Sequence, residues 1–219
     1  MKISVIIPAL NDGKLLYSTL EDLYAHHAPD EVIVVDGGST DQTLKIASEW
    51  TTVISSPKGR ARQMNAGAKQ AAGEIFLFLH SDTRLPERGL SKIREAMEAG
   101  IAAGRFTMRF DHSHWLLRLF AHYTRLPCFS YGDQGFFVRR DVFQYLSGFR
   151  EDIPFEDVDF YKRLSAVTRP VILKDPVVTS AQRFLEGSGK REKWLRFLLA
   201  GLYYMGFKIS HLKQKPYSI

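Results

Sequence analysis

The stretch Val32-Ile33-Val34-Val35-Asp36-Gly37-Gly38-Ser39-Thr40-Asp41 decides the fold. A run of β-branched residues is typical of a strand that is buried on both faces, as in a parallel sheet. The polar, glycine-rich residues after it predict a tight turn into a helix, capped by Ser39 or Asp41. Ligands bind α/β sheets at the carboxyl ends of the strands, so Asp36 is a candidate ligand-binding residue.

The same alternation of strand, turn and helix extends in both directions. Strands are predicted over residues 3–7, 31–36, 53–54 and 74–79, and helices over 15–25, 42–49, 60–72 and 87–99. This order predicts an α/β fold with a mostly parallel sheet flanked by helices. The second half is less regular, with strands at 103–110, 136–139 and 171–178 and helices at 114–123, 141–146 and 155–165. A C-terminal helical extension is predicted from about residue 190.

Composition restricts the classes of partner. The 219 residues carry a formal net charge of +6, which permits an anionic partner. Nucleic acid is excluded as a partner, because the basic residues are dispersed until the C-terminal stretch. With Cys128 as the single cysteine, no signal peptide ahead of the first strand and no apolar run long enough to span a bilayer, we expect a cytoplasmic protein.

Two turns favour anion binding, and each has a structural alternative. Pro8-Ala9-Leu10-Asn11-Asp12 leaves a strand and opens a helix, where backbone N–H groups favour anions or where Asn11 or Asp12 simply caps the helix. Arg60 and Arg62 lie in the first turn of a helix, against the helix dipole. They either hold an anion or form a solvated basic face.

Acidic residues follow the later strands and open a helix. Asp82 in His80-Ser81-Asp82 is a candidate ligand for a cation that bridges two phosphates. His80 is a poorer ligand for Mg²⁺ and is expected to support the site from behind the ligands. Glu156-Asp157 opens the helix at 155–165 and provides a candidate general base, whereas Asp159 is expected to pair with Arg163. The apolar residues Trp115, Leu116, Leu117, Leu119, Phe120 and Tyr123 are predicted to be core.

Taken together, these motifs resemble glycosyltransferase family 2, which has the GT-A fold. The resemblance runs in order and spacing through about residue 163, and its motifs are residues 4–8, 34–41 and 60–67, Asp82, Gly148-Phe149 and Glu156-Asp157. Residues 78–83, 131–135 and 179–184 more narrowly resemble a bacterial subgroup associated with radical-SAM and selenodomain genes.

The resemblance implies an inverting transfer of sugar from a nucleotide-diphosphate sugar, UDP-linked, through bound Mg²⁺ or Mn²⁺. Asp157, backed by Glu156, would be the base, and Asp82 with His80 would form the metal site. The residues implied for the nucleotide are Pro8, Ala9, Asn11, Asp36, Gly38, Arg60, Arg62, Asn65, Ser81 and Arg183, and those for the acceptor are Tyr131, Gly132, Asp133 and Gln134.

Two positions depart from the family pattern, and two rival functions stay open. His80 and Gly37 stand where the family commonly has Asp. The first departure affects metal binding, and the second affects recognition of the nucleobase of the donor. The rivals are a non-catalytic nucleotide-binding or regulatory protein on the same fold and a sugar nucleotidyltransferase. Arg183 is expected to neutralise the leaving group, or else to be an exposed basic residue.

The expected domain covers residues 1–185, with a nucleotide-sugar half at about 1–110 and an acceptor half at about 111–185. The extension at 186–219 combines basic residues with an apolar stripe around Trp194. It would either lie on an anionic membrane surface, favouring a lipid-phosphate acceptor, or pack on the domain or a second subunit, favouring a soluble hydroxyl.

Overall fold

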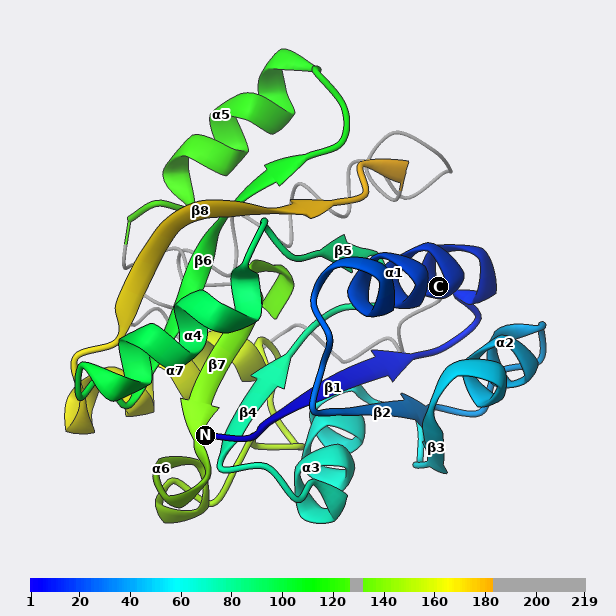
Figure 1. Cartoon of the computed structure of the whole chain (residues 1–219), viewed down its shortest axis with the longest axis horizontal. Coiled ribbons are helices and arrows are strands. Elements are labelled where there is room, and N and C mark those ends of the chain that lie inside the picture. Colours follow the sequence, from blue (N-terminus) through cyan, green and yellow to red (C-terminus); the bar gives the residue numbers. More distant parts are fainter. Residues whose placement is uncertain (127–131, 183–219) are drawn as a thin grey trace.

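A computed structural model of the chain describes residues 1–126 and 132–182 (Figure 1). Strands β1 (Ile3–Ala9), β2 (Glu31–Asp36), β3 (Thr52–Ser55) and β4 (Ile75–Phe78) are parallel neighbours in the order β3-β2-β1-β4. Helices α1 (Gly13–His26), α2 (Thr43–Trp50) and α3 (Arg60–Gln70) connect them. The predicted α/β fold and its parallel half are confirmed.

The second half of the chain adds antiparallel pairs and makes the sheet mixed. β7 (Phe136–Arg139) pairs antiparallel with both β4 and β6 (Ala103–Phe110). β6 pairs parallel with β8 (Val171–Thr179), which carries the two-residue strand β5 (Thr83–Arg84) at the edge. Strand β5 and the single turn η1 (Gly132–Gln134) were not predicted, because elements this short leave no periodic pattern.

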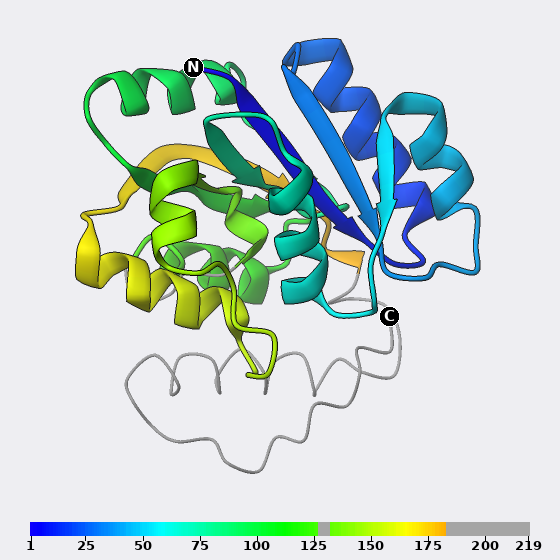
Figure 2. The same ribbon diagram turned by 90° about the horizontal axis from the view of Figure 1, so that it is seen from below.

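Two apolar clusters cover the two faces of the sheet. Alternate residues of β1, such as Val5 and Ile6, point to opposite faces and belong to different clusters. One cluster includes α1, α4 (Gly89–Glu98) and α5 (Trp115–Tyr123), and the other includes α3, α6 (Arg140–Tyr145) and α7 (Glu156–Val167). Figure 2 shows α1 and α4 on one side of the sheet and α3, α6 and α7 on the other.

The core prediction for α5 was only partly right. Leu117 and Phe120 are buried as predicted, but Trp115, Leu119 and Tyr123 are 66%, 45% and 44% exposed. A helix that packs on a sheet from one side buries one stripe, and α5 carries apolar residues on two sides.

The predicted C-terminal helix and the boundary at residue 185 lie outside the described residues. Within the described part, no helix combines the length and the apolar character needed to cross a bilayer.

Gly67 sets how closely α3 approaches the sheet. A Cβ at this position would lie 2.4 Å from Ile6 Cγ2 and 3.0 Å from Val35 Cγ2. We expect Gly67→Ala to destabilise the protein by about 1–3 kcal/mol, because overpacking outweighs the better helix propensity of Ala. Urea denaturation measures this, with Lys69→Ala at an exposed position of α3 as the control. A Gly67→Ala protein as stable as the wild type would contradict the close packing.

Candidate active site at the carboxyl edge of the sheet

Strand direction brings the candidate residues to one edge. Parallel pairing places the carboxyl ends of β1, β2 and β4 side by side, at Ala9, Asp36 and the residues before Asp82. β6 and β8 run in the same direction as β4, because β7 is antiparallel to both β4 and β6. Thr179 at the end of β8 therefore joins this edge, where α/β sheets bind ligands.

The turns after β1 and β2 are hydrogen-bonded into one surface. The Asp36 carboxylate is 4% exposed and accepts the N–H groups of Gly38 (2.9 Å) and Ser39 (3.1 Å). The Asn11 N–H donates to Ser39 Oγ (2.9 Å), and Asn11 Oδ1 accepts the Thr40 N–H (2.8 Å). Asp36 and Asn11 thus fix the shape of the loop surface beside which a ligand would lie.

The cap predictions have different outcomes. Asp41 Oδ1 accepts the Thr43 N–H, the first of α2, at 2.9 Å, but the N-cap position of α2 belongs to Gln42 and carries no side-chain cap bond. For α1, the alternative of a side-chain cap is not found: Asp12 occupies the N-cap position without a side-chain cap bond, and its carboxylate accepts the Ser81 hydroxyl at 2.6 Å. This buried bond ties the first turn to the loop after β4 and accounts for the 2% exposure of Ser81.

Gln63 is a buried polar residue that sequence reasoning missed. Its Nε2 donates to the carbonyl oxygens of Ala9 (2.9 Å) and Val35 (2.8 Å) and so bridges β1 and β2. A Cβ on Gly37 would lie 3.1 Å from the Gln63 amide. The glycine that departs from the family pattern therefore adjoins this bridge, and no sequence periodicity marks a glutamine for such a role.

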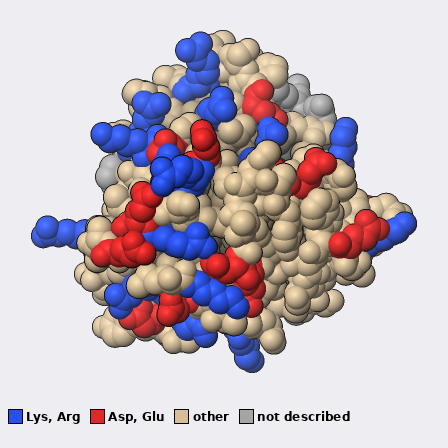
Figure 3. Space-filling model, viewed as in Figure 1, with Lys and Arg blue, Asp and Glu red and all other residues tan. Residues whose placement is uncertain are grey.

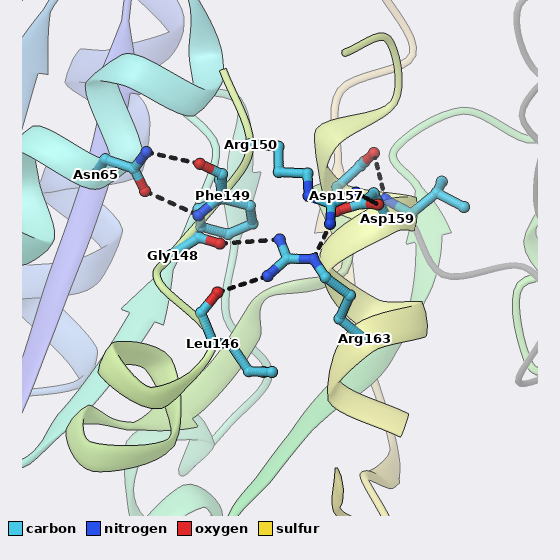
Figure 4. A network of polar contacts seen from close by, with 9 residues as sticks. Asn65, Leu146, Gly148, Phe149, Arg150, Asp157, Asp159 and Arg163 are labelled. Atoms are coloured by element: carbon cyan, nitrogen blue, oxygen red, sulfur yellow. Dashed lines mark hydrogen bonds and ion pairs between the residues drawn. The ribbon is translucent and has the colours of Figure 1, made fainter. Parts of the chain in front are cut away.

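The three polar residues predicted on α3 have different surroundings. Arg62 is half exposed, and its Nε lies 3.5 Å from Glu151 Oε2. Asn65 pairs with the backbone of Phe149, donating Nδ2–H to its oxygen and accepting its N–H, both at 2.9 Å (Figure 4). Arg60 is partly buried and acts electrostatically on two acids, Asp133 and Glu156.

The predicted ion pair between Asp159 and Arg163 is confirmed. Arg163 Nε lies 2.7 Å from Asp159 Oδ2, and its two terminal nitrogens donate to the carbonyl oxygens of Leu146 (2.7 Å) and Gly148 (2.9 Å) (Figure 4). Arg150 also binds Asp159, at 3.3 Å. This network fixes the loop before α7 and therefore the position at which α7 begins.

Glu156 and Asp157 open α7 with different exposures. Glu156 is 6% exposed, and its Oε1 makes no hydrogen bond within residues 1–126 and 132–182. Asp157 is partly exposed, and its Oδ1 accepts the Val158 N–H at 2.8 Å. Burial raises the pKa of Glu156 to about 7, the adjacent Asp157 charge adds to this rise, and Arg60 opposes it.

Asp82 and Asp133 lie at the same site. Asp82 is 8% exposed and accepts a hydrogen bond from Thr83 Oγ1 (3.2 Å), which lies 3.1 Å from Thr179 Oγ1. Thr179 Oγ1 in turn donates to the Asp133 carbonyl oxygen at 3.3 Å. Burial raises the pKa of Asp133 to about 6, which Arg60 opposes and the charges of Asp82 and Asp157 support. We refer to Arg60, Asp82, Asp133, Glu156 and Asp157 as the acidic cluster.

The remaining predicted residues have the following positions. Pro8 and Ala9 belong to β1, and the Ala9 carbonyl oxygen accepts the Gly37 N–H at 2.9 Å. His80 is 6% exposed, and its carbonyl oxygen accepts the Thr83 N–H. Gly132 and Gln134 belong to η1, and the fully buried Gln134 donates to the Thr124 carbonyl oxygen at 3.1 Å. Tyr131 and Arg183 lie outside the described residues.

Arg105 is a second buried residue that the sequence did not mark. It is 1% exposed on β6 and donates to the carbonyl oxygens of Thr124 (2.8 Å) and Leu126 (3.0 Å). Gln134 donates to the same Thr124 oxygen, so Arg105 and η1 are joined through the end of α5. Placing η1 also places Asp133, which is how a strand residue supports the acidic cluster.

Comparison with known proteins matches this arrangement to a family. The family model described as Glycosyl transferase family 2 matches residues 4–153. The chain belongs to glycosyl transferase family 2. Its fold also resembles the mannosyltransferase PcManGT from Pyrobaculum calidifontis in complex with GDP-Man and Mn²⁺, with a TM-score of 0.75 at 20% identity, covering 93% of this chain and 64% of that one.

Two curated relatives are more similar in sequence over shorter stretches. Poly(ribitol-phosphate) beta-N-acetylglucosaminyltransferase TarS of Staphylococcus aureus is 37% identical over 93 residues, which cover 37% of this chain and 16% of TarS. The crystal structure of TarS 1–349 in complex with UDP-GlcNAc has a TM-score of 0.69 at 21% identity, covering 94% and 66% of the two chains. A PGL/p-HBAD biosynthesis glycosyltransferase of Mycobacterium tuberculosis is 32% identical over 126 residues, covering 51% of this chain and 49% of the relative.

The raised pKa of Glu156 predicts a pH dependence of stability. Between pH 4.5, its ordinary pKa, and about 7, the folded protein keeps a proton on Glu156 that the unfolded chain has released. Stability therefore falls as pH rises through this window, and Glu156→Gln should reduce the fall. Urea denaturation at pH 5 and pH 8 measures the difference, with Glu98→Gln at an exposed site of α4 as the control. Identical pH slopes for Glu156→Gln and the wild type would contradict the assignment.

Proposed function

We propose that this protein transfers a sugar, with inversion, from a nucleoside-diphosphate sugar to a hydroxyl or lipid-phosphate acceptor. The observation that supports this most directly is the acidic cluster at the carboxyl edge of the sheet. Its Arg60 acts electrostatically on Asp133 and Glu156, and the charges of Asp82 and Asp157 act on Asp133. Acids brought together at a partly buried site raise one another's pKa, and such sites are often functional. Family membership gives the class of reaction.

The donor is proposed to lie between the Asp36 loop and the acidic cluster. The Asp36 and Asn11 loops would take the nucleoside, and Arg60 would face the diphosphate. A UDP-linked donor is favoured because TarS, the relative with 37% identity, has been crystallised with UDP-GlcNAc. The complex of PcManGT with GDP-Man makes GDP the comparison to test. Arg62 and Asn65 are proposed to position the loop at 148–151, since both contact it.

A Mg²⁺ or Mn²⁺ ion is proposed to bind at Asp82. The carboxylate fits a hard cation that takes its other ligands from phosphate oxygens and water. Among residues 1–126 and 132–182, no group of three or more His, Cys, Asp and Glu has the arrangement of a metal site, so Asp82 would share the ion with the substrate. When bound, such an ion stabilises charge on the departing diphosphate. The neighbouring His80 is proposed to hold Asp82 in position without binding the ion itself.

Asp157 is proposed as the base that takes the proton of the acceptor. It is partly exposed, so an acceptor can reach it, whereas Glu156 is 6% exposed. With a pKa of about 7, Glu156 is protonated for much of the time at neutral pH. A protonated Glu156 lowers the local negative charge and leaves Asp157 to act as the carboxylate.

Acceptor residues are proposed on η1 and the segment before it. Asp133 belongs to the acidic cluster and could contact an acceptor. Gln134 is proposed to position η1 without contacting the acceptor, because its buried amide donates to the Thr124 carbonyl oxygen. On the basis of the sequence, we further propose that Tyr131 and Gly132 contact the acceptor and that Arg183 neutralises the leaving group. The same basis supports a cytoplasmic location, self-association through the extension at 186–219, and membership of the radical-SAM-associated subgroup.

Asp157→Asn tests the base. We expect turnover to fall by about 10²–10⁴-fold while nucleotide affinity stays within about 2-fold, because a general base acts on the acceptor proton alone. The measurement is UDP release from a UDP-sugar with a panel of hydroxyl and polyprenyl-phosphate acceptors, together with UDP calorimetry. Asp152→Asn, which changes an exposed acid in the loop before α7, is the control.

Three outcomes would contradict the assignment of Asp157 as the general base or the assignment of the reaction. Wild-type turnover in Asp157→Asn would remove the base assignment. Release of pyrophosphate in place of UDP would favour the nucleotidyltransferase, and nucleotide binding without turnover on any acceptor would favour the regulatory alternative.

Asp82→Asn tests the metal site. We expect Mn²⁺ or Mg²⁺ to raise UDP affinity in the wild type and to have little effect in Asp82→Asn, because the bridging carboxylate is lost. His80→Ala should lose less. Calorimetry of UDP, GDP and CDP binding, with metal and with EDTA, measures the effect of the metal on affinity. It also determines which nucleobase the protein prefers. Asp141→Asn, on the exposed start of α6, is the control. Equal UDP affinity of the wild type in EDTA and in Mn²⁺ would exclude the proposed ion.

A further inference from the structure

Helix α5 presents a second apolar stripe to solvent. Leu117, Phe120 and Ala121 pack in the core cluster with Phe110. On another side, Trp115, Leu119 and Tyr123 follow one another at four-residue spacing, and Leu126 just beyond the helix is 47% exposed. Contiguous apolar side chains of this size on a surface mark an interaction site more often than single exposed residues do.

Exposed basic residues lie on α5 and in the residues directly before and after it. Arg109, Arg118 and Arg125 are exposed, as are His112 and His122. The only acid between residues 109 and 126 is Asp111, whose carboxylate accepts the Ala181 N–H at 2.7 Å. Figure 3 shows Lys and Arg side chains, with acidic side chains beside them, at the upper end of the molecule, where Figure 1 shows α5.

Charge argues against two candidates for covering this face, the C-terminal segment of the chain and a second copy of the protein. Residues 183–219 carry eight Lys and Arg and two acids, so this segment holds the entire formal charge of +6. The basic residues of α5 would repel it. A second copy bound through a two-fold axis would bring the same basic face against itself. An anionic surface supplies the opposite charge over the whole patch.

We propose that α5 is an interfacial helix that seats the protein on an anionic lipid bilayer. Trp115 and Leu119 would enter the headgroup region, and Arg118 and Arg125 would bind lipid phosphates. Aromatic and leucine side chains beside arginines are the composition of helices that lie in a bilayer surface. This binding is separate from glycosyl transfer and does not depend on it.

The position of α5 in the fold gives the docking a consequence. α5 follows β6, which ends at the same edge of the sheet as the acidic cluster. The Asp111 N–H donates to the Thr179 carbonyl oxygen (3.1 Å), and the Thr179 hydroxyl lies 3.1 Å from that of Thr83, next to Asp82. A bilayer under α5 would therefore lie on the side of the molecule where Asp82 and the acidic cluster are found.

Vesicle co-sedimentation of the full chain tests the proposal. We expect binding to vesicles of phosphatidylcholine with phosphatidylglycerol and little binding to phosphatidylcholine alone. Arg118→Glu/Arg125→Glu and Trp115→Ser/Leu119→Ser should each lower the partition coefficient about 10-fold or more, because each removes charge attraction or inserted apolar area. Tyr145→Ser, at a 77% exposed site on α6, is the matched control and should bind as the wild type does.

Three results would overturn the proposal. Equal binding to both kinds of vesicle removes the anionic partner. Binding that survives both α5 variants but is lost in Lys208→Glu/Lys213→Glu assigns the anchor to the C-terminal segment. Absence of vesicle binding together with a dimer that Trp115→Ser/Leu119→Ser dissociates assigns the face to self-association. Circular dichroism of every variant separates these results from misfolding.

Discussion

The guanidinium of Arg163 connects helix α7 to the loop before it, and that loop is bound to helix α3. It binds Asp159 on its own helix and the carbonyl oxygens of Leu146 and Gly148 in the loop before that helix. The next residue of the loop, Phe149, is paired with Asn65 on α3. Arg163 thus connects the start of α7, where Glu156 and Asp157 lie, to the helix that carries Arg60. A planar guanidinium with several donors in fixed directions is suited to this role, whereas the donors of a lysine share a single nitrogen and cannot span three separate acceptors in this way.

Holding the acids of the cluster close together costs electrostatic free energy, and the connection through Arg163 keeps two of them, Glu156 and Asp157, in place. Burial and mutual repulsion raise the pKa of both Asp133 and Glu156, and Arg60 is the cation that opposes both shifts. A protein selected for stability alone would separate or neutralise such acids. Their retention at the carboxyl edge of the sheet fits a site whose charge is completed by a substrate and a cation.

The two halves of the sheet differ in how they are built. The first half repeats one unit, in which each strand returns through a helix to a parallel neighbour, so its polar turns all reach one edge. The second half has an irregular register between Phe106 and Thr107, where β8 runs beside β6. There, buried side chains such as Arg105 and Gln134 hold the loops in place of regular turns. This half also carries α5, whose exposed stripe faces away from the core.

The sequence alone determined the parallel half of the fold, because β-branched runs, turns and helical periodicity are local signals. It also determined that Asp36, Asp82 and Glu156-Asp157 follow strands or open a helix, and it predicted the pair between Asp159 and Arg163, which lies within one turn of helix. Tertiary structure decided which acids share a site, since Asp82, Asp133 and Glu156 are far apart in the chain. It also decided the roles of Gln63, Asn65 and Arg105, which bind backbone groups distant in sequence. Such contacts leave no periodic trace, because a carbonyl oxygen that receives a hydrogen bond places no demand on the type of its own side chain.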